Sequence, residues 1–221
     1  MRRIAIIVIL VISLAFVGCS YTPDTSDSYV NVDGSETTPY DIDTSEAQSI
    51  DVSESSETVE INNGGTYFIT GSTDDNMIIV DVSDSEEVNL ILENVNITSE
   101  TSAPVYVKSA GSVTISLAGS NTLSNAGVFA VIGEDEIDAV IFCESNLTIT
   151  GDGTLDIVSP QGHGIVCKDN LFIENGTFNI TAGIDGINAN DTLSIVANNK
   201  GSITAFKSDE DIIFTCKFQL S

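Results

Sequence analysis

Four residues recur at one position of an internal repeat, and they are the strongest candidates in this sequence for chemistry. Asp138, His163, Asp185 and Asp211 each precede a small apolar or Gly-Ile step. Stacked on successive coils they would lie about 5 Å apart, where carboxylates repel unless a cation lies among them. Carboxylate oxygens on loops suit Ca²⁺, and Asp209 lies beside the last member. We therefore predict a calcium site formed by Asp138, Asp185, Asp209 and Asp211. The competing interpretation is that each aspartate only caps its own turn.

The histidine of this column is a second candidate, because Gly162-His163-Gly164 resembles a motif of the polygalacturonases. Those enzymes also carry an Asn-Thr-Asp and paired aspartates on preceding coils, and neither stands in the required order here. Pectate-lyase-like chemistry needs an Arg or Lys base, for which Lys168 and Lys207 are the candidates. We expect a non-catalytic protein, with a β-helix polysaccharide lyase or glycoside hydrolase as the alternative.

Sugar binding by aromatic stacking has little support, because the sequence contains no tryptophan. Most of the phenylalanines fall at strand positions typical of a core, and Tyr106 and Phe129 are the aromatic residues least committed to one. His163, Lys168 and Tyr106 are therefore weak candidates for carbohydrate contacts. Cation bridges and hydrogen bonds would have to contribute more than stacking.

The elements that position these residues repeat. Residues 153–165 align with residues 176–187, so that Gly-Thr, Gly-Ile and Leu-x-Ile return in the same order, and a third pass begins at Gly201. Self-similarity at steps of 22 to 26 residues indicates a solenoid, in which each coil stacks on its neighbours. Short β-rich runs with apolar alternation, and no helical period, make the body all-β.

A right-handed parallel β-helix of about six coils accounts for this repeat. A β-sandwich is the alternative, but it does not explain why the same motifs return in order. An insertion at residues 130–137 lengthens one coil. We take equivalent strands to be anchored on Leu90, Ile115, Leu147, Leu171 and Leu193, with steps of 25, 32, 24 and 22 residues.

Three segments are expected along the chain. Residues 1–19 read as a lipoprotein signal peptide, with Cys19 as the lipidated residue, and a cleaved secretory signal is the alternative. Residues 20–58 are rich in Ser, Thr and acidic residues and are predicted to be a disordered linker. Residues 59–221 form the β-helix, which stops partway through a coil, so the domain is expected to be incomplete. The protein is thus expected outside the cell, anchored to a membrane by lipid or secreted, as a monomer.

Charge and cysteines narrow the classes of partner. The formal charge is −26, which excludes nucleic acid, since phosphate binding needs clustered Lys and Arg. Cys143, Cys167 and Cys216 form no disulfide or zinc pattern. Cys143 and Cys167 would stack on adjacent coils, as buried free thiols or, alternatively, as a bridge.

The repeat also resembles a known family. Residues 147–157, His163-Gly-Ile and the run from Asp185 to Ile195 are similar to the clostridial carbohydrate-binding domain family of surface lipoproteins. The resemblance implies a right-handed parallel β-helix that binds calcium and acidic plant polysaccharide, notably polygalacturonate, or cellulose. It implies a non-catalytic role at the cell surface. A structural adhesin or spacer without a sugar ligand is the remaining alternative.

Overall fold

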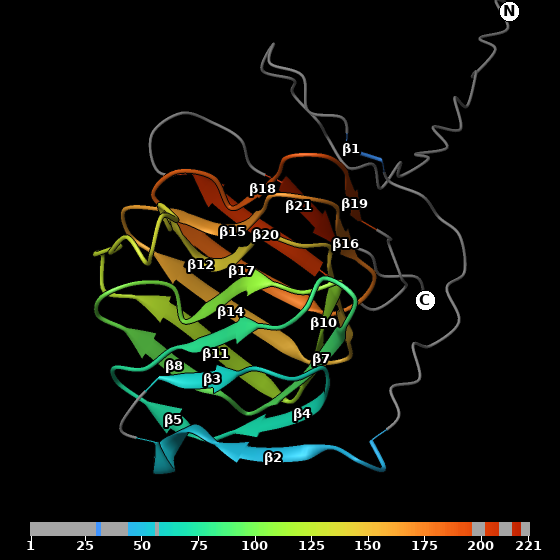
Figure 1. The fold of residues 1–221 in the computed structure, drawn as a ribbon. Coiled ribbons are helices and arrows are strands. Elements are labelled where there is room, and N and C mark those ends of the chain that lie inside the picture. The colour runs from blue at the N-terminus through green and yellow to red at the C-terminus, as the bar shows by residue number, and fades with distance from the viewer. Residues whose placement is uncertain (1–29, 32–43, 56–57, 196–201, 208–213, 218–221) are drawn as a thin grey trace, which may run out of the picture.

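The structure, a computed structural model, describes residues 30–31, 44–55, 58–195, 202–207 and 214–217. Its strands form three sheets in which, among these residues, all neighbours but one pair run parallel. Each coil contributes one strand to each sheet in turn, and six such coils stack from β3 to β20 (Figure 1). This confirms the predicted parallel β-helix and excludes the β-sandwich.

Sheet A has eight strands, in spatial order β1 (Val30–Asn31), β19 (Leu193–Ile195), β16 (Leu171–Ile173), β13 (Leu147–Gly151), β10 (Ser112–Ala118), β7 (Glu87–Glu93), β4 (Gly65–Thr70) and β2 (Gln48–Asp51). Sheet B has six, β18 (Ile187–Ala189), β15 (His163–Cys167), β12 (Ala139–Cys143), β9 (Val105–Ser109), β6 (Ile78–Asp81) and β3 (Val59–Ile61). Sheet C has seven, β21 (Phe214–Lys217), β20 (Ser202–Lys207), β17 (Thr177–Ala182), β14 (Thr154–Ser159), β11 (Ser120–Asn125), β8 (Asn96–Ser99) and β5 (Ser72–Thr73).

The core consists of inward ladders that the alternating sequence creates. Period-2 alternation puts every second side chain inside the coil. The parallel register then stacks apolar side chains on apolar side chains of the next coil. Ile115 pairs with Leu90 on one side and Ile149 on the other, and all three side chains are fully buried. Each such aliphatic side chain contributes about 1.5–3 kcal/mol by burial.

The predicted register is wrong at one step. Leu147 pairs with Val113, whereas Leu90 and Ile115 align with Ile149. The step across the insertion is therefore 34 residues (113 to 147) rather than 32. A slip of two residues keeps the same face inside, so the apolar pattern alone could not reveal it.

The body begins before residue 58, which corrects the predicted linker boundary. Strand β2 pairs with β4, and the 3₁₀ turn η1 (Val52–Glu54) buries Val52 in the core. Strand β1, also within the predicted linker, pairs with β19. At the other end, β21 pairs antiparallel with β20 instead of starting another parallel rung. No helix within the described residues has the length and hydropathy to cross a membrane.

The two cysteines of sheet B behave as predicted for buried free thiols. Cys143 and Cys167 are direct partners on β12 and β15, and both are buried and unbridged. Their Sγ atoms donate to the same Ser145 carbonyl oxygen, at 3.0 and 3.2 Å. Burial raises the pKa of the Cys143 thiol. The side chain of Cys216 lies outside the described part of the chain.

The insertion between β11 and β12, residues 126–138, covers part of the outer face of sheet B. Tyr106 and Phe142 point outward from β9 and β12, yet both are buried. Phe129, Ile132 and Ile137 of the insertion pack with them in a second, smaller apolar cluster. The insertion therefore makes a small outer core where a simple coil would leave an open sheet.

Candidate functional site

The structure brings three of the four predicted column residues together at one end of sheet B. His163 Nε2 lies 3.6 Å from Asp138 Oδ2, and its Nδ1 lies 3.2 Å from Asp185 Oδ2. The Asp185 backbone N–H also donates to Nδ1, at 3.2 Å. The imidazole is only 12% exposed, whereas the side chains of Asp138 and Asp185 are 49% and 33% exposed. The histidine thus lies between two partly exposed carboxylates, with Nδ1 as the acceptor of the Asp185 backbone N–H.

Backbone geometry explains why His163 stands between two glycines. A Cβ on Gly162 would collide with the Asp138 carbonyl oxygen and the Phe129 ring. A Cβ on Gly164 would lie 2.5 Å from both the Gly186 carbonyl oxygen and Ile180 Cγ2. The Gly-His-Gly sequence is therefore accounted for by close contact between coils, with no need for a catalytic role.

The strand register shows that the predicted column of Asp138, His163, Asp185 and Asp211 is offset by one residue at Asp138. His163 pairs with Ala139, and Asp138 precedes that position by one residue. The backbone N–H of His163 donates to the Asp138 carbonyl oxygen at 2.7 Å, which holds the two residues side by side. The pairing of Ile165 with Ile187 places Asp185 directly opposite His163 on the next coil.

Only part of the predicted metal site can be placed. Asp138 and Asp185 meet around His163, whereas Asp209, Asp211 and the predicted lipidation residue Cys19 lie outside the described residues. Within the described residues, no group of three or more His, Cys, Asp and Glu side chains has an arrangement that could hold a metal ion. Asp138 Oδ1 is shielded from solvent and has no hydrogen-bond partner. A hard cation would satisfy such an acceptor, so the residues present fit part of a calcium coordination shell.

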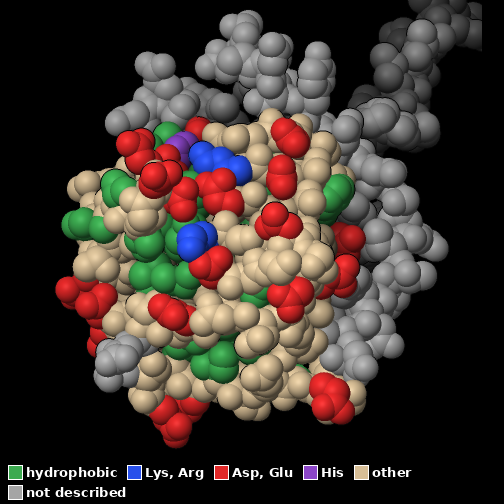
Figure 2. Space-filling view, in the orientation of Figure 1, with side chains coloured by type: hydrophobic (Ala, Val, Ile, Leu, Met, Phe, Trp, Pro, Cys, Tyr) green, Lys and Arg blue, Asp and Glu red, His purple; other side chains and the backbone are tan. Residues whose placement is uncertain are grey.

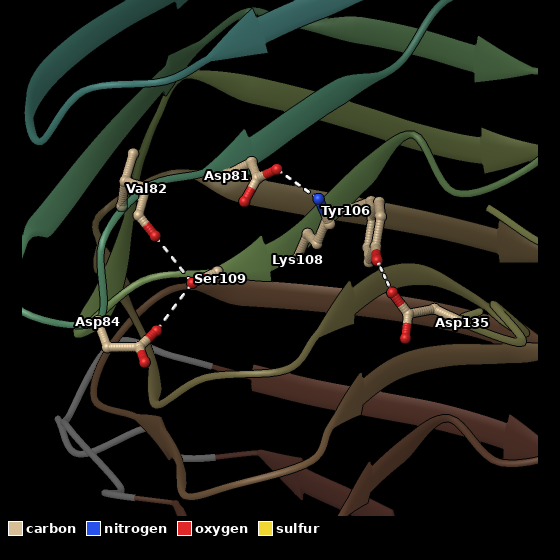
Figure 3. A network of polar contacts seen from close by, with 7 residues as sticks. All are labelled: Asp81, Val82, Asp84, Tyr106, Lys108, Ser109 and Asp135. Carbon is tan, nitrogen blue, oxygen red and sulfur yellow. Dashed lines mark hydrogen bonds and ion pairs between the residues drawn. The ribbon is translucent and has the colours of Figure 1, made fainter. Parts of the chain in front are cut away.

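Tyr106 is not available as a sugar-stacking platform, which corrects its place among the weak carbohydrate candidates. Its ring is fully buried and tilted against Phe142, with ring centroids 6.0 Å apart. Its hydroxyl donates to Asp135 Oδ2 in the insertion (Figure 3). Burial raises the pKa of Tyr106, and the Asp135 carboxylate reinforces the shift. Tyr106 holds the insertion against sheet B.

Lysines and carboxylates alternate on the rest of the outer face of sheet B. Lys108 Nζ lies 2.5 Å from Asp81 Oδ2 (Figure 3), and this contact raises the lysine pKa. Glu144 and Lys168 follow on the next two coils, since each comes directly after a register-paired residue. Lys168 Nζ lies 5.1 Å from the centroid of the Phe142 ring. Burial raises the pKa of Glu144, and nearby Lys168 opposes that shift.

Among the residues whose side chains the structure describes, both lysines, Lys108 and Lys168, lie on this face. Figure 2 shows two lysine patches among carboxylates, with the single histidine near the upper one. Sequence reasoning named Lys168 but missed Lys108, Glu144 and Asp135. Lys108 and Glu144 have a recoverable signal, because Lys108 lies near the end of β9 and Glu144 directly follows β12. Asp135 has none, since the insertion follows no repeat.

Comparison with known proteins agrees with this fold. A model of the family described as carbohydrate-binding domain-containing proteins matches residues 55–214. A carbohydrate-binding domain-containing protein of Acetivibrio thermocellus is 31% identical over 189 residues, covering 82% of this chain and 65% of the relative. This chain thus spans less than two thirds of that relative's length. A solved polysaccharide lyase-like protein from C. thermocellum, as a gadolinium derivative, shares 25% identity, with a TM-score of 0.58 over 72% of this chain and 89% of that one. The chain therefore belongs to the family of carbohydrate-binding domain-containing proteins.

Proposed function

We propose that this protein is a non-catalytic, monomeric carbohydrate-binding protein of the cell surface that binds acidic polysaccharide of the polygalacturonate type with the help of Ca²⁺. The observation that carries the proposal is that Asp138 and Asp185 lie on either side of His163, where strands of sheet B begin, with partly exposed carboxylates. Family membership supports carbohydrate as the partner.

The charge of the protein requires a cation for this partner. A chain with a formal charge of −26 repels a polyuronate, and the two placed lysines of sheet B already have acidic neighbours. A divalent ion shared between protein and uronate carboxylates removes the repulsion. Asp138 and Asp185 would hold this ion, with Asp138 Oδ1 as the acceptor that lacks a partner.

A lyase-type function is the second candidate, because a solved neighbour is called polysaccharide lyase-like. The placed lysines do not favour it. Lys108 is paired with Asp81, and Lys168 lies over the Phe142 ring beside Glu144. A lysine that acts as a general base must lose its proton near neutral pH, and the Asp81 contact instead raises the pKa of Lys108.

The test is retention of the protein on polygalacturonate with Ca²⁺ and after chelation with EDTA. We expect chelation to release the protein, and Asp138→Asn/Asp185→Asn to weaken retention by about tenfold, the loss of about 1.4 kcal/mol. Asp152→Asn is the matched control, since this aspartate also has a partner on the next coil. Undiminished retention in EDTA would refute the calcium bridge. Formation of unsaturated product from pectate would favour the lyase instead.

A further inference from the structure

The insertion, residues 126–138, presents apolar side chains to solvent as well as to its own small core. Val131 and Val128 are 61% and 56% exposed, more than any other large hydrophobic side chain in the described part of the chain. Phe129, between them, already supplies the contact with the outer core. The fold therefore does not require valine at these two positions. The exposed apolar residues of this stretch are Ala126, Val128, Ala130 and Val131.

Two turns on the following coils extend this apolar surface along the edge where sheet C connects to sheet B (Figure 1). A Cβ on Gly127 would lie 3.6 Å from Gln161 Cδ, and one on Gly183 would lie 2.3 Å from the Pro160 carbonyl oxygen. The insertion and the two turns thus stack in order, and Ile184, which is 38% exposed, ends the series. Two coil steps of about 4.8 Å make a span of about 10 Å, equal to about three residues of extended chain. We call the exposed residues Ala126, Val128, Ala130, Val131, Pro160 and Ile184 the corner patch.

Hydrogen bonds hold the insertion part of the corner patch in place. Ile132 and Asp135 exchange both backbone hydrogen bonds, each at 3.1 Å, which closes a tight turn. The Tyr106 hydroxyl donates to the Asp135 carboxylate from sheet B. The Ala130 N–H donates to the carbonyl oxygen of Thr101 at 2.7 Å. A surface that is already ordered loses little conformational entropy when a partner docks.

Acidic side chains border the corner patch and determine the charge of its partner. Glu134 and Glu136 are exposed in the insertion, and the partly exposed Asp138 and Asp185 follow toward sheet B. Figure 2 shows hydrophobic and acidic side chains together on this side of the molecule. The insertion and the two turns contain no lysine or arginine. A second copy of this chain or a polyuronate would bring like charges together, whereas a cationic partner is attracted.

We propose that the corner patch docks an extended segment of another protein, in which a short apolar centre is flanked by Lys or Arg residues. Large exposed apolar patches with a polar rim are typical of protein–protein contacts. The apolar centre supplies affinity by burial, and the flanking cations supply orientation and a faster association rate. The apolar residues of the patch are distinct from the Asp138 and Asp185 pair, so this inference goes beyond the proposed function.

The experiment is fluorescence anisotropy with a fluorescein-labelled peptide that has two valines in its centre and two lysines at each end, in EDTA and physiological salt. We expect the wild-type protein to bind it at least about tenfold more tightly than peptides with serine for valine or glutamate for lysine. Val128→Ser/Val131→Ser should weaken binding by about tenfold or more. Val158→Ser/Phe172→Ser is the matched control, because it removes two exposed apolar side chains from other faces, and it should bind as wild type does.

The acidic border has its own test. Glu134→Gln/Glu136→Gln should weaken binding and reduce its dependence on salt. Equal binding of the valine and serine peptides, no binding of the valine peptide, or a folded Val128→Ser/Val131→Ser protein that binds like wild type would overturn the proposal. A wild-type dimer in sedimentation that this double variant converts to a monomer would assign the patch to a second copy and overturn the proposed partner. Retention of the double variant on polygalacturonate should equal that of wild type, so the two proposals fail or stand separately.

Discussion

The hydroxyl of Tyr106 donates a hydrogen bond that connects sheet B to the insertion. Removal of this hydroxyl gives a quantitative test of the outer core. Tyr106→Phe keeps the ring in contact with Phe142 and deletes only the hydrogen bond to Asp135. A hydrogen bond to a charged group contributes about 1.5–3 kcal/mol. Asp135 is half-buried, so water replaces part of this bond, and we expect a loss of about 1–2 kcal/mol. In a protein of this size that lowers Tm by about 2–8 °C.

Burial of Tyr106, reinforced by the contact with Asp135, gives the stability a pH dependence. The pKa of Tyr106 is raised in the folded protein, so the folded state keeps a proton that the unfolded state loses above about pH 10. The contribution is therefore complete below pH 10 and decreases as pH rises further, by at most about 1.4 kcal/mol per pH unit. Tyr106→Phe should lack this component of the alkaline loss.

The assay is urea unfolding from pH 7 to 11, together with limited proteolysis within residues 126–138. Tyr67→Phe is the control, because the Tyr67 hydroxyl donates to a neutral carbonyl, that of Asn63, at 2.8 Å. It should cost about 1 kcal/mol without opening the insertion to protease. A Tyr106→Phe protein with wild-type stability at pH 7 and wild-type protease resistance would refute the role of this hydroxyl as a fastener.

Three further predictions test the core. Gly164→Ala should destabilise the protein by about 1–3 kcal/mol through overpacking against the next coil, and a urea midpoint equal to wild type would contradict the close contact. Ile149→Ala should cost about 2–5 kcal/mol by leaving a cavity, whereas the exposed Val158→Ala should stay within about 0.5 kcal/mol in thermal unfolding. Cys143 and Cys167 should resist an alkylating reagent in the folded protein and react after denaturation, as seen by mass spectrometry, and rapid labelling of the native protein would show that they are not buried.

The repeat predicts the fold well for two reasons. Apolar alternation determines which side chains face inward, and parallel stacking then pairs equivalent residues on successive coils. The recurrence of Gly-Thr, Gly-Ile and Leu-x-Ile predicts which residues pair, and the aligned pair Ile165 and Ile187 is found in register. The method fails where the repeat is interrupted. Across the insertion the period is lost, and the repeat therefore predicts Ile115 as the partner of Leu147, two residues from the observed partner Val113.

The candidate site was predicted in outline for the same reason. Asp138, His163 and Asp185 do meet, because each precedes or begins a strand of sheet B. What the sequence could not show is which side chains the insertion covers. Tyr106 lies on an outward position that is exposed in a simple coil, and only the packing of residues 126–138 makes it part of a core.

The ladders also explain why this acidic solenoid can stack without a cation at every coil. An acid repeated at one position would place like charges about 4.8 Å apart, at a cost that rises with each coil. At two places among the described residues, an acid instead has a neutral partner on the next coil. Asn175 Nδ2 donates to Asp152 Oδ1 at 2.8 Å, and Asn179 Nδ2 donates to Asp156 Oδ1 at 2.7 Å. His163 occupies the corresponding place between its two aspartates. The histidine that interrupts the acidic column is therefore a spacer of the same kind, which separates two carboxylates that would otherwise lie on successive coils.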